Sequence, residues 1–538
     1  MHHHFLISSF EKNYPRLFLS GTAYHNDNII IDSAGLEYYS ERFGKSVLPE
    51  IKEGRFLLAY EDNGEYFIRS DITGQELIFY YNGREGWVVS TSFLHIIEFL
   101  KKHSISVSLN KSALSTFRIP HSFGDSLATN DTVVNEIKLL RLDNQIIINK
   151  KNKLITQINK IEDDSQNLSP SEIIKIYVKK WQKRIFALSK IASNHKIVCD
   201  VSGGVDSRTV FGLILSSDVN LERFDFNSNP TWVDDYKIAT ILSKAYSIPL
   251  NMAKKDKMQR PSVYAQFELF CYSSIGVYRN VYFPANDTAS TNFHFSGSGG
   301  ENIRQFYNAT PNEFINRFEK FFLHENFKFD DFRTLFLSNL DELGIDKDDP
   351  KGMIKHYRNF RSRFHFGREW YKRYSTILIT PLFDDSLNKL CDSLPVSDID
   401  KNYIILSIML ESSFHLPLFP FDKPYKNFDI ELYNTLAFNY ENDTEKDDCE
   451  IAPLIFWDNT NTTPQTLVET NNMESDIDIS CIISDKLLNI SKENIKAYSS
   501  DEELNNALKI LHTEKTRAGY TKTTYLLLLY FLQENNVI

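Results

Sequence analysis

Cysteine is scarce in this chain, and the few cysteines stand far apart. They occur at positions 199, 271, 391, 449 and 481, with no close pair among them. A disulfide framework and a cysteine-based zinc site both need cysteines at short, regular spacings. The sequence fits neither of these, and it suits a reducing compartment.

Long apolar runs are missing as well. The run from Tyr525 to Leu532 is less than half the length of a membrane span, and no other run approaches one. The N-terminus reads Met1-His2-His3-His4-Phe5-Leu6-Ile7, without the basic and apolar regions of a signal peptide. We therefore expect a cytoplasmic protein with no membrane partner, and we assign His2 to His4 no metal role.

Positive charge is in deficit. Lys and Arg number 60 against 71 Asp and Glu, which gives a formal net charge of −11. General nucleic-acid binding needs a basic footprint, so we expect no nucleic-acid partner. One stretch, 355–373, interleaves basic and aromatic residues. We interpret it as amphipathic helices beside the mouth of an active site rather than as a nucleic-acid groove.

The residues that are present indicate a folded chain of two or three domains. The length is 538 residues and apolar residues make up 42%, which is enough for a sizeable core. In the first 150 residues, short apolar runs alternate with the turns Asn63-Gly64 and Asn82-Gly83. Because both residue types tolerate positive φ, these turns predict hairpins and a mainly antiparallel β domain.

The middle of the chain predicts a parallel sheet. Ser169 to Glu172 has the pattern of a capping box at the start of a long helix. A buried strand over 196–201, a glycine turn and a helix over 208–215 then form one β-loop-α unit. A second unit follows over 224–250, with a helix at 234–246 and an apolar segment at 248–250. From Pro311 onward the pattern is mostly helical.

The glycine turn between strand and helix has the composition of an anion site. It reads Ser202-Gly203-Gly204-Val205-Asp206-Ser207. Glycines allow a phosphate to approach the backbone, and the helix N-terminus favours negative charge. Asp206 would place a carboxylate near a magnesium ion that bridges phosphates.

This string resembles the PP-loop of the ATP pyrophosphatases, which cleave ATP between the α and β phosphates. The segment Phe295-Ser296-Gly297-Ser298-Gly299-Gly300-Glu301 resembles the second glycine-rich loop of asparagine synthetases, where an acidic residue helps to hold magnesium pyrophosphate. The resemblance implies that ATP binds along 202–207, Gly299 and Gly300, and that Asp206 and Glu301 hold Mg²⁺. Here glutamate replaces the usual aspartate, and Asn302 replaces the acidic residue that follows.

Two further segments continue the resemblance. Thr380 to Asp385 is similar to the family's Pro-Phe-Leu-Asp segment, although Ile377 and Ile379 stand where asparagine-making members carry Glu and Arg. The absence of these two charged side chains argues against a pocket that is specific for aspartate. Pro420 to Tyr425 resembles the region whose lysine neutralises charge on the adenylate and pyrophosphate, which implies a catalytic role for Lys423 beside Asp206.

The N-terminal part resembles the family's glutaminase half, in segments such as Gly54 to Tyr60 and Arg69 to Asp71. A glutaminase of this type uses an N-terminal cysteine, but no cysteine precedes Cys199. We therefore expect a scaffold without glutaminase activity.

The expected fold class is α/β. A degenerate antiparallel Ntn-like domain over 1–165 precedes a parallel-sheet PP-loop domain over 166–430, of the adenine nucleotide α-hydrolase type, and a mainly helical extension over 431–538.

The expected function is an ATP-dependent ligase that adenylates a small-molecule or peptide carboxylate before an amine attacks. The amine could be free ammonia, ammonia from a separate glutaminase, or a group on the substrate itself, as in the related β-lactam synthetases and lasso peptide cyclases. An inactive nucleotide-binding relative is the alternative from another class. The sequence leaves both substrates, the oligomeric state and the role of 431–538 open.

Overall fold

The computed structural model describes residues 4–11, 14–158, 168–191, 195–252, 258–259, 261–284, 286–287, 292–322, 326–367, 369–373, 376–441, 453–458 and 478–538. The domain boundary placed at 165, the residues His2 and His3, and Cys449 lie outside these ranges. Cys199, Cys271, Cys391 and Cys481 are free thiols.

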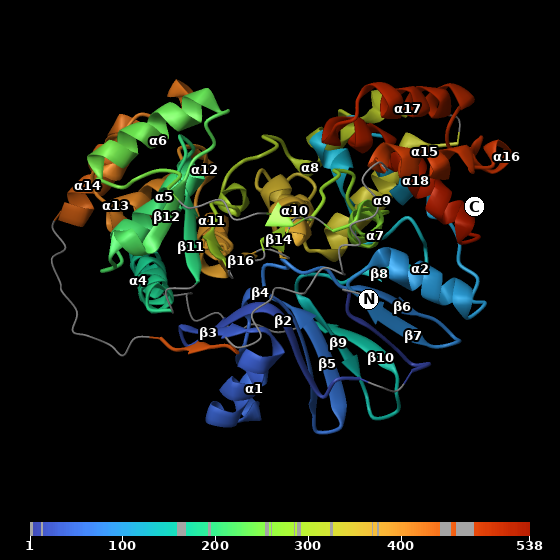
Figure 1. Ribbon diagram of the computed structural model, residues 1–538, viewed down its shortest axis with the longest axis horizontal. Helices are drawn as coiled ribbons and strands as arrows, with labels where there is room; N and C mark the ends of the chain where they lie inside the picture. The colour runs from blue at the N-terminus through green and yellow to red at the C-terminus, as the bar shows by residue number, and fades with distance from the viewer. Residues whose placement is uncertain are drawn as a thin grey trace.

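Two antiparallel sheets form the lower part of the molecule in Figure 1. The first has the strand order β1(Leu6–Ser8)-β7(Trp87–Ser90)-β6(Phe79–Asn82)-β8(Ile137–Leu139). The second has the order β10(Leu154–Ile158)-β9(Asn144–Ile148)-β5(Glu65–Ser70)-β4(Glu53–Asp62)-β2(Leu17–His25)-β3(Asn28–Ile31)-β17(Ile455–Phe456). All of these neighbours pair antiparallel except β17, which pairs parallel with β3. The prediction of a β-rich N-terminal part is confirmed.

One predicted hairpin turn has the expected geometry and the other is longer. Asn63 and Gly64 take φ values of 50° and 78° between the paired residues Asp62 and Glu65. Both central residues of a tight I′-type turn need positive φ, which Asn and Gly tolerate best. After Asn82, however, the chain forms a loop over 83–86 before pairing resumes at Trp87.

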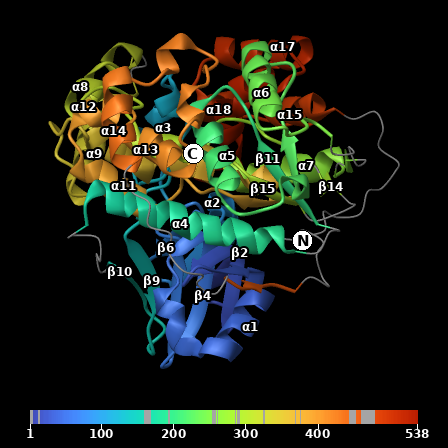
Figure 2. The same ribbon diagram turned by 90° about the vertical axis from the view of Figure 1, so that its left-hand side faces the viewer.

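A third sheet is parallel, with the order β12(Phe224–Asn227)-β11(Lys196–Asp200)-β15(Asn292–Phe295)-β16(Thr376–Ile379). The helices α4(Pro170–Ser189), α5(Val205–Leu215), α6(Val233–Ala245), α11(Asp385–Ser393) and α13(Tyr403–Ser412) contribute apolar residues to the core that includes its strands. Helix α4 begins with the predicted capping box. In Figure 2 it lies between the antiparallel strands below and the helices above.

One prediction about this region was wrong in detail. The helix after the glycine turn begins at Val205 rather than Arg208, so Asp206 and Ser207 belong to its first turn. In the apolar segment at 248–250, Leu250 makes an isolated bridge to Phe226. An apolar run this short cannot be assigned from its pattern alone.

The rest of the described chain is largely helical, as predicted from Pro311 onward. The remaining α-helices and short strands are α1(Asp32–Phe43), α2(Phe93–Lys102), α3(Lys111–Thr116), α7(Val263–Ser274), β13(Met258–Gln259), β14(Asn286–Asp287), α8(Pro311–Asn316), α9(Phe329–Glu342), α10(Gly352–Asn359), α12(Val396–Asp400), α14(Ile430–Glu441), α15(Ile479–Leu488), α16(Lys492–Ile495), α17(Asp501–Thr513) and α18(Arg517–Glu534).

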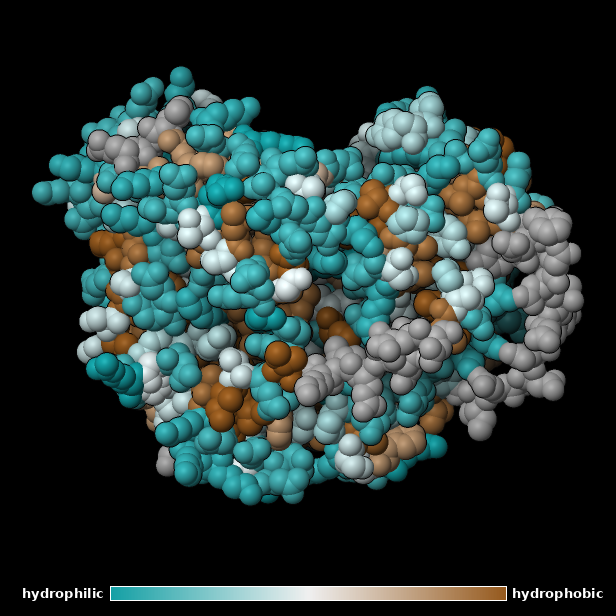
Figure 3. All heavy atoms as spheres, turned by 180° about the vertical axis from the view of Figure 1, so that it is seen from behind, coloured by the Kyte–Doolittle hydropathy of each residue, from teal (hydrophilic) through white to brown (hydrophobic). Residues whose placement is uncertain are grey.

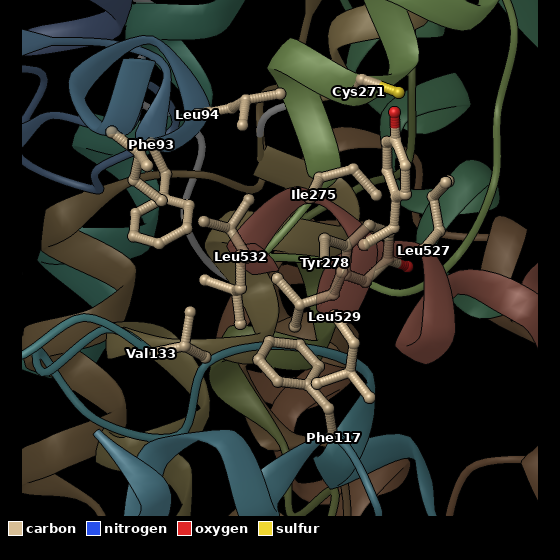
Figure 4. Close-up of a cluster of buried hydrophobic side chains, with 14 of the residues drawn as sticks. Phe93, Leu94, Phe117, Val133, Cys271, Ile275, Tyr278, Leu527, Leu529 and Leu532 are labelled. Atoms are coloured by element: carbon tan, nitrogen blue, oxygen red, sulfur yellow. The ribbon is translucent and has the colours of Figure 1, made fainter. Parts of the chain in front are cut away.

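The C-terminal helices are joined to the N-terminal part through one apolar core. Leu527, Leu529 and Leu532 of α18 pack in the same buried cluster as Phe93 of α2 and Ile275 (Figure 4). The C-terminal helices therefore cover α2 and α7. With its antiparallel sheets, its parallel sheet and its helices, the molecule is a mixed α/β protein. Figure 3 shows the opposite face, where hydrophilic residues predominate and a hollow separates two lobes at the upper edge.

Candidate nucleotide site

The loop between β11 and α5 is held by hydrogen bonds to its own serines and to two other segments. The Ser202 hydroxyl accepts from the Gly204 N–H at 3.0 Å and lies 2.6 Å from the Ser207 hydroxyl. The Gly203 N–H donates to Asp235 of α6 at 3.0 Å, and the Gly203 carbonyl accepts from the Asp422 N–H at 3.1 Å. A Cβ on Gly203 would lie 2.6 Å from the Asp422 Cβ, so this close approach requires glycine.

The N-terminus of α5 has the properties of an anion site. Its N-cap residue is Gly204, which supplies no side-chain cap to the first-turn amides. The Asp235 carboxylate on the Gly203 amide shows that the loop accepts an anionic oxygen. The positive end of the helix dipole adds to this preference. Ser202, Gly203, Gly204, Val205 and Ser207 therefore lie where a phosphate group could bind.

The second glycine-rich loop packs directly on the first. A Cβ on Gly297 would lie 2.6 Å from the Ser207 nitrogen, and one on Gly300 would lie 2.0 Å from Asp206 Oδ1. Gly299 has a φ of 107°, which other residues rarely adopt. The two loops come from adjacent parallel strands, β11 and β15. The glycines therefore let the loops touch and bring Glu301 to Asp206.

Asp206, Glu301 and Arg304 form a compact group that we call the loop cluster. Arg304 lies 2.7 Å from Asp206 Oδ2 and 3.7 Å from Glu301 Oε1. The other two oxygens, Asp206 Oδ1 and Glu301 Oε2, are buried without a hydrogen-bond partner. Burial first, and the charge of Asp206 second, raise the pKa of Glu301 to about 7, although Arg304 opposes this shift.

The loop cluster fits a magnesium ion. Magnesium prefers oxygen ligands, commonly one or two carboxylates together with phosphate and water oxygens. Two carboxylates with one cation carry an excess negative charge, and each has an oxygen available for a metal. Within the described ranges, no group of three or more His, Cys, Asp or Glu side chains could hold a metal ion. Asp206 and Glu301 would therefore need phosphate and water oxygens to complete the coordination.

Lys423 lies beside the loop but is engaged elsewhere. It follows Asp422, whose N–H contacts Gly203, and its ammonium makes an ion pair of 2.6 Å with Asp234 of α6. Its side chain is 47% exposed. A role in charge neutralisation would require Lys423 to turn from Asp234 toward the loop. The next lysine, Lys426, pairs with Asp422 at 2.8 Å.

The Thr380–Asp385 segment has a structural role at a joint between sheets. Asp384 caps α11 through the Ser386 N–H and accepts from Lys180 of α4 at 2.6 Å. Lys180 also reaches Glu53 of β4 at 3.1 Å, and Arg184 reaches Glu53 at 2.8 Å. We call Glu53, Lys180, Arg184 and Asp384 the joint cluster.

The basic stretch at 355–373 is paired inside the protein. Arg361 contacts Asp125 at 2.9 Å, and the Arg363 Nε donates to the Gly74 carbonyl at 3.0 Å. Further ion pairs are Lys355–Asp349, Arg358–Asp392, Lys372–Glu369 and Arg373–Glu76. These cations are therefore engaged in contacts within the protein.

Sequence reasoning missed three contributors to the site. Arg304 was detectable as a basic residue at i+3 from Glu301, a spacing that brings side chains together in a helical turn. Asp234 and Asp235 were detectable only as acidic residues at the start of a helix. Acidic residues stabilise a helix N-terminus, so their presence there does not indicate a function.

A separate pocket of about 550 Å³ has no motif residue in its lining. It lies among α2, α7, α15 and α18, and Leu94, Phe267, Ile482 and Phe531 are among the residues that line it. Among the described residues, no helix has both the length and the apolar character needed to cross a membrane.

Comparison with known proteins gives little information about this chain. No protein-family model matches it, and no curated protein matches it. Among solved structures, glutamine phosphoribosylpyrophosphate amidotransferase from B. subtilis, complexed with ADP and GMP, matches with 10% identity and a TM-score of 0.13. The match covers 52% of this chain and 49% of that one, so the chain spans about half of that structure. A TM-score this low carries no argument about fold or function.

Proposed function

We propose that this chain is an ATP-dependent carbon–nitrogen ligase of the asparagine synthetase type, without glutaminase activity of its own. In this proposal the antiparallel sheets are a degenerate Ntn-like half and the parallel sheet is a PP-loop domain. The observation that carries it is the junction of the two glycine-rich loops. That junction places Asp206 and Glu301 side by side at a helix N-terminus, each with an unpartnered oxygen.

The loops would bind ATP through its phosphates. The first-turn amides of α5 and the hydroxyls of Ser202 and Ser207 supply donors, and the glycines allow close approach. The Asp235 carboxylate accepts the hydrogen bond of the Gly203 N–H, so a phosphate oxygen must displace this carboxylate to bind there. Magnesium held by Asp206 and Glu301 would neutralise charge on the departing pyrophosphate.

The protein's contribution to the chemistry is positioning and charge balance. A substrate carboxylate held near the α-phosphate displaces pyrophosphate and gives an acyl-adenylate, which an amine then attacks. Adenylation converts a poor electrophile into a reactive one, and the site must exclude water until the amine arrives. Lys423, once released from Asp234, would balance negative charge in both steps.

The partners in this proposal follow from that chemistry. They are a small-molecule or peptide carboxylate and an amine or ammonia donor. A cytoplasmic location is part of the same proposal, and the free thiols at the four described cysteines agree with a reducing compartment.

The test is pyrophosphate release from ATP and magnesium with candidate carboxylates added singly, with and without ammonia. The proposal expects release that depends on one class of acid and that Asp206→Asn abolishes. Asp218→Asn, at an exposed position after α5, is the matched control and should retain release. Release that is unchanged in Asp206→Asn would overturn the assignment. Release that needs no ammonia and yields a cyclic product would favour ring closure. Nucleotide binding without release with any acid would favour an inactive relative.

A further inference from the structure

A histidine and an aspartate meet at the edge of the parallel sheet from which both glycine-rich loops leave. His294 lies on β15 and Asp200 is the last residue of β11, and His294 Nε2 is 2.7 Å from Asp200 Oδ2. The first loop begins at Ser202, and the second follows β15 through Ser296 and Gly297. Ligands of open parallel sheets bind beyond the carboxyl ends of the strands. The pair therefore lies at the end of the sheet where the proposed reaction takes place.

The two side chains project from the face of the sheet that lies opposite the apolar core. Side chains alternate between the faces of a strand. Ile197, Cys199 and Phe293 belong to the apolar core on one side, so Val198, Asp200 and His294 point to the other. Asp225 of β12 pairs with Val198 and shares that face. A histidine and a carboxylate here are not needed to fill the core.

The geometry leaves one imidazole nitrogen available. Because Nε2 faces the Asp200 carboxylate, Nε2 carries the proton and donates it. Nδ1 then has a free lone pair, and it has no hydrogen-bond partner in the described part of the chain. The side chain of Asp200 is 49% exposed and that of His294 is 18% exposed, so the pair is partly buried. The charge of Lys372 also acts on Asp200; burial raises the pKa of Asp200, but His294 and Lys372 together lower it.

We propose that His294 is the general base that deprotonates the attacking amine, and that Asp200 is the positioning residue that holds His294 in the tautomer with a free Nδ1. This inference rests on the proposed ligase function and names the class of its second substrate. An alkylamine, or ammonia taken from solution, arrives as an ammonium ion and must lose a proton before it attacks. Ammonia delivered by an internal glutaminase would arrive neutral, and the proposed function includes no such activity.

The proposed step balances in protons and bonds. The ammonium nitrogen gives one proton to His294 Nδ1, and the resulting imidazolium is stabilised by Asp200. The free amine then forms a bond to the acyl carbon while the bond from that carbon to the AMP oxygen breaks. The new amide nitrogen loses its second proton to the departing AMP or to water, and His294 later returns its proton to solvent.

The test separates the two half-reactions with two nucleophiles. The probes are ammonium chloride, which is protonated near neutral pH, and hydroxylamine, which is neutral there and traps acyl-adenylates without a base. The carboxylate is one that supports pyrophosphate release by the wild type. His294→Gln should release pyrophosphate and form hydroxamate within about threefold of wild type, but should form amide about 100-fold more slowly. Raising the pH should partly restore the amide rate. Asp200→Asn should show the same pattern to a smaller extent, and Asp225→Asn is the matched control on the same face.

Several results would overturn the inference. An equal loss with both nucleophiles in His294→Gln would indicate a structural role, and an unchanged amide rate would indicate no role. If the wild type releases no pyrophosphate with any carboxylate, the ligase proposal itself fails, and this inference falls with it. A measurement without substrate adds a further check: ¹⁵N NMR of the imidazole should show the proton on Nε2 in the wild type and a mixture of tautomers in Asp200→Asn. A wild-type proton on Nδ1 would contradict the assigned base.

Discussion

The joint cluster and the loop cluster both combine carboxylates with cations, but the first has equal numbers of each and the second has one cation too few. The joint cluster has the carboxylates Glu53 and Asp384 and the cations Lys180 and Arg184. Burial disfavours ionised Glu53, but the charges of Lys180 and Arg184 outweigh it and lower the pKa of Glu53 to about 2. In the loop cluster, two carboxylates share Arg304 alone, and the pKa of Glu301 is raised to about 7. The first cluster is complete as an internal contact, whereas the second lacks a positive charge.

This difference distinguishes a structural contact from a site that awaits a ligand. Buried charges are normally paired, and a carboxylate oxygen that is buried without a partner is costly. In the joint cluster, the cations pair with carboxylates and hold β4, α4 and α11 together. In the loop cluster, the free-energy cost of the unpartnered carboxylate oxygens remains at the junction of two glycine-rich loops, where a metal–phosphate complex could relieve it.

Removing a cation from the joint cluster should have the largest effect on stability. Lys180→Met leaves Asp384 without its cation and Glu53 with Arg184 alone, so we expect a loss of about 3 kcal/mol in the free energy of unfolding. This figure allows for the partial exposure of Glu53. Urea unfolding measures it, with Lys244→Met at an exposed position of α6 as the control. A loss below about 1 kcal/mol would show that the joint cluster does not hold the sheets together.

Removing a carboxylate from the loop cluster should change activity and leave stability almost unchanged. Asp206→Asn leaves Glu301 and Arg304 as a balanced pair, so stability should stay within about 0.5 kcal/mol of wild type. Pyrophosphate release should fall at least about 100-fold, because a charged group at the reacting phosphates is lost. Unfolding and activity are measured on the same preparation. A large loss of stability with activity retained would reverse the comparison.

The pH dependence of stability should identify Glu301. Its folded pKa is about 7 against an ordinary value of 4.5, so the folded state binds the proton more tightly than the unfolded state. Its contribution to stability is therefore fully present below pH 4.5 and is lost as pH rises through about 7. Glu301→Gln should remove this dependence, an effect of up to about 3 kcal/mol between these limits. Parallel unfolding curves for the two proteins at both pH values would contradict the assignment.

Added Mg²⁺ should have the smallest effect on stability, and the size of this effect should depend on Arg304. If the proposed site binds Mg²⁺, the ion would compete in the wild type with Arg304, which pairs with Asp206. Arg304→Gln leaves those charges unbalanced, so Mg²⁺ should stabilise this variant by about 1 kcal/mol more than it stabilises the wild type. Thermal unfolding above pH 7, with and without Mg²⁺, measures the difference. Equal shifts in the two proteins would indicate that the ion binds elsewhere.

The features that the sequence predicted are those that depend on residues close together in the chain. The Asn63-Gly64 turn, the capping box at Ser169 and the strand-loop-helix unit at 196–215 are local patterns whose conformations follow from φ preferences and helix capping. The contact between the two glycine-rich loops was anticipated only through resemblance, because it joins segments far apart in the chain.

What the sequence did not predict depends on long-range packing. Lys180 meets Glu53 and Asp384, which lie 127 and 204 residues away. The strand β17 joins β3 although most of the sequence separates them. Asp200 and His294 lie 94 residues apart in the sequence, and only the register of β11 on β15 brings them together. No local propensity encodes such pairings.

The most direct test of the central claim is the fate of an ¹⁸O-labelled carboxylate incubated with ATP, magnesium and ammonium. The acid is one that supports nucleotide turnover by the wild-type protein, and the products are analysed by mass spectrometry. The account predicts AMP that carries one ¹⁸O atom, together with unlabelled pyrophosphate and an amide. The appearance of ADP and phosphate, or of AMP without the label, would contradict it.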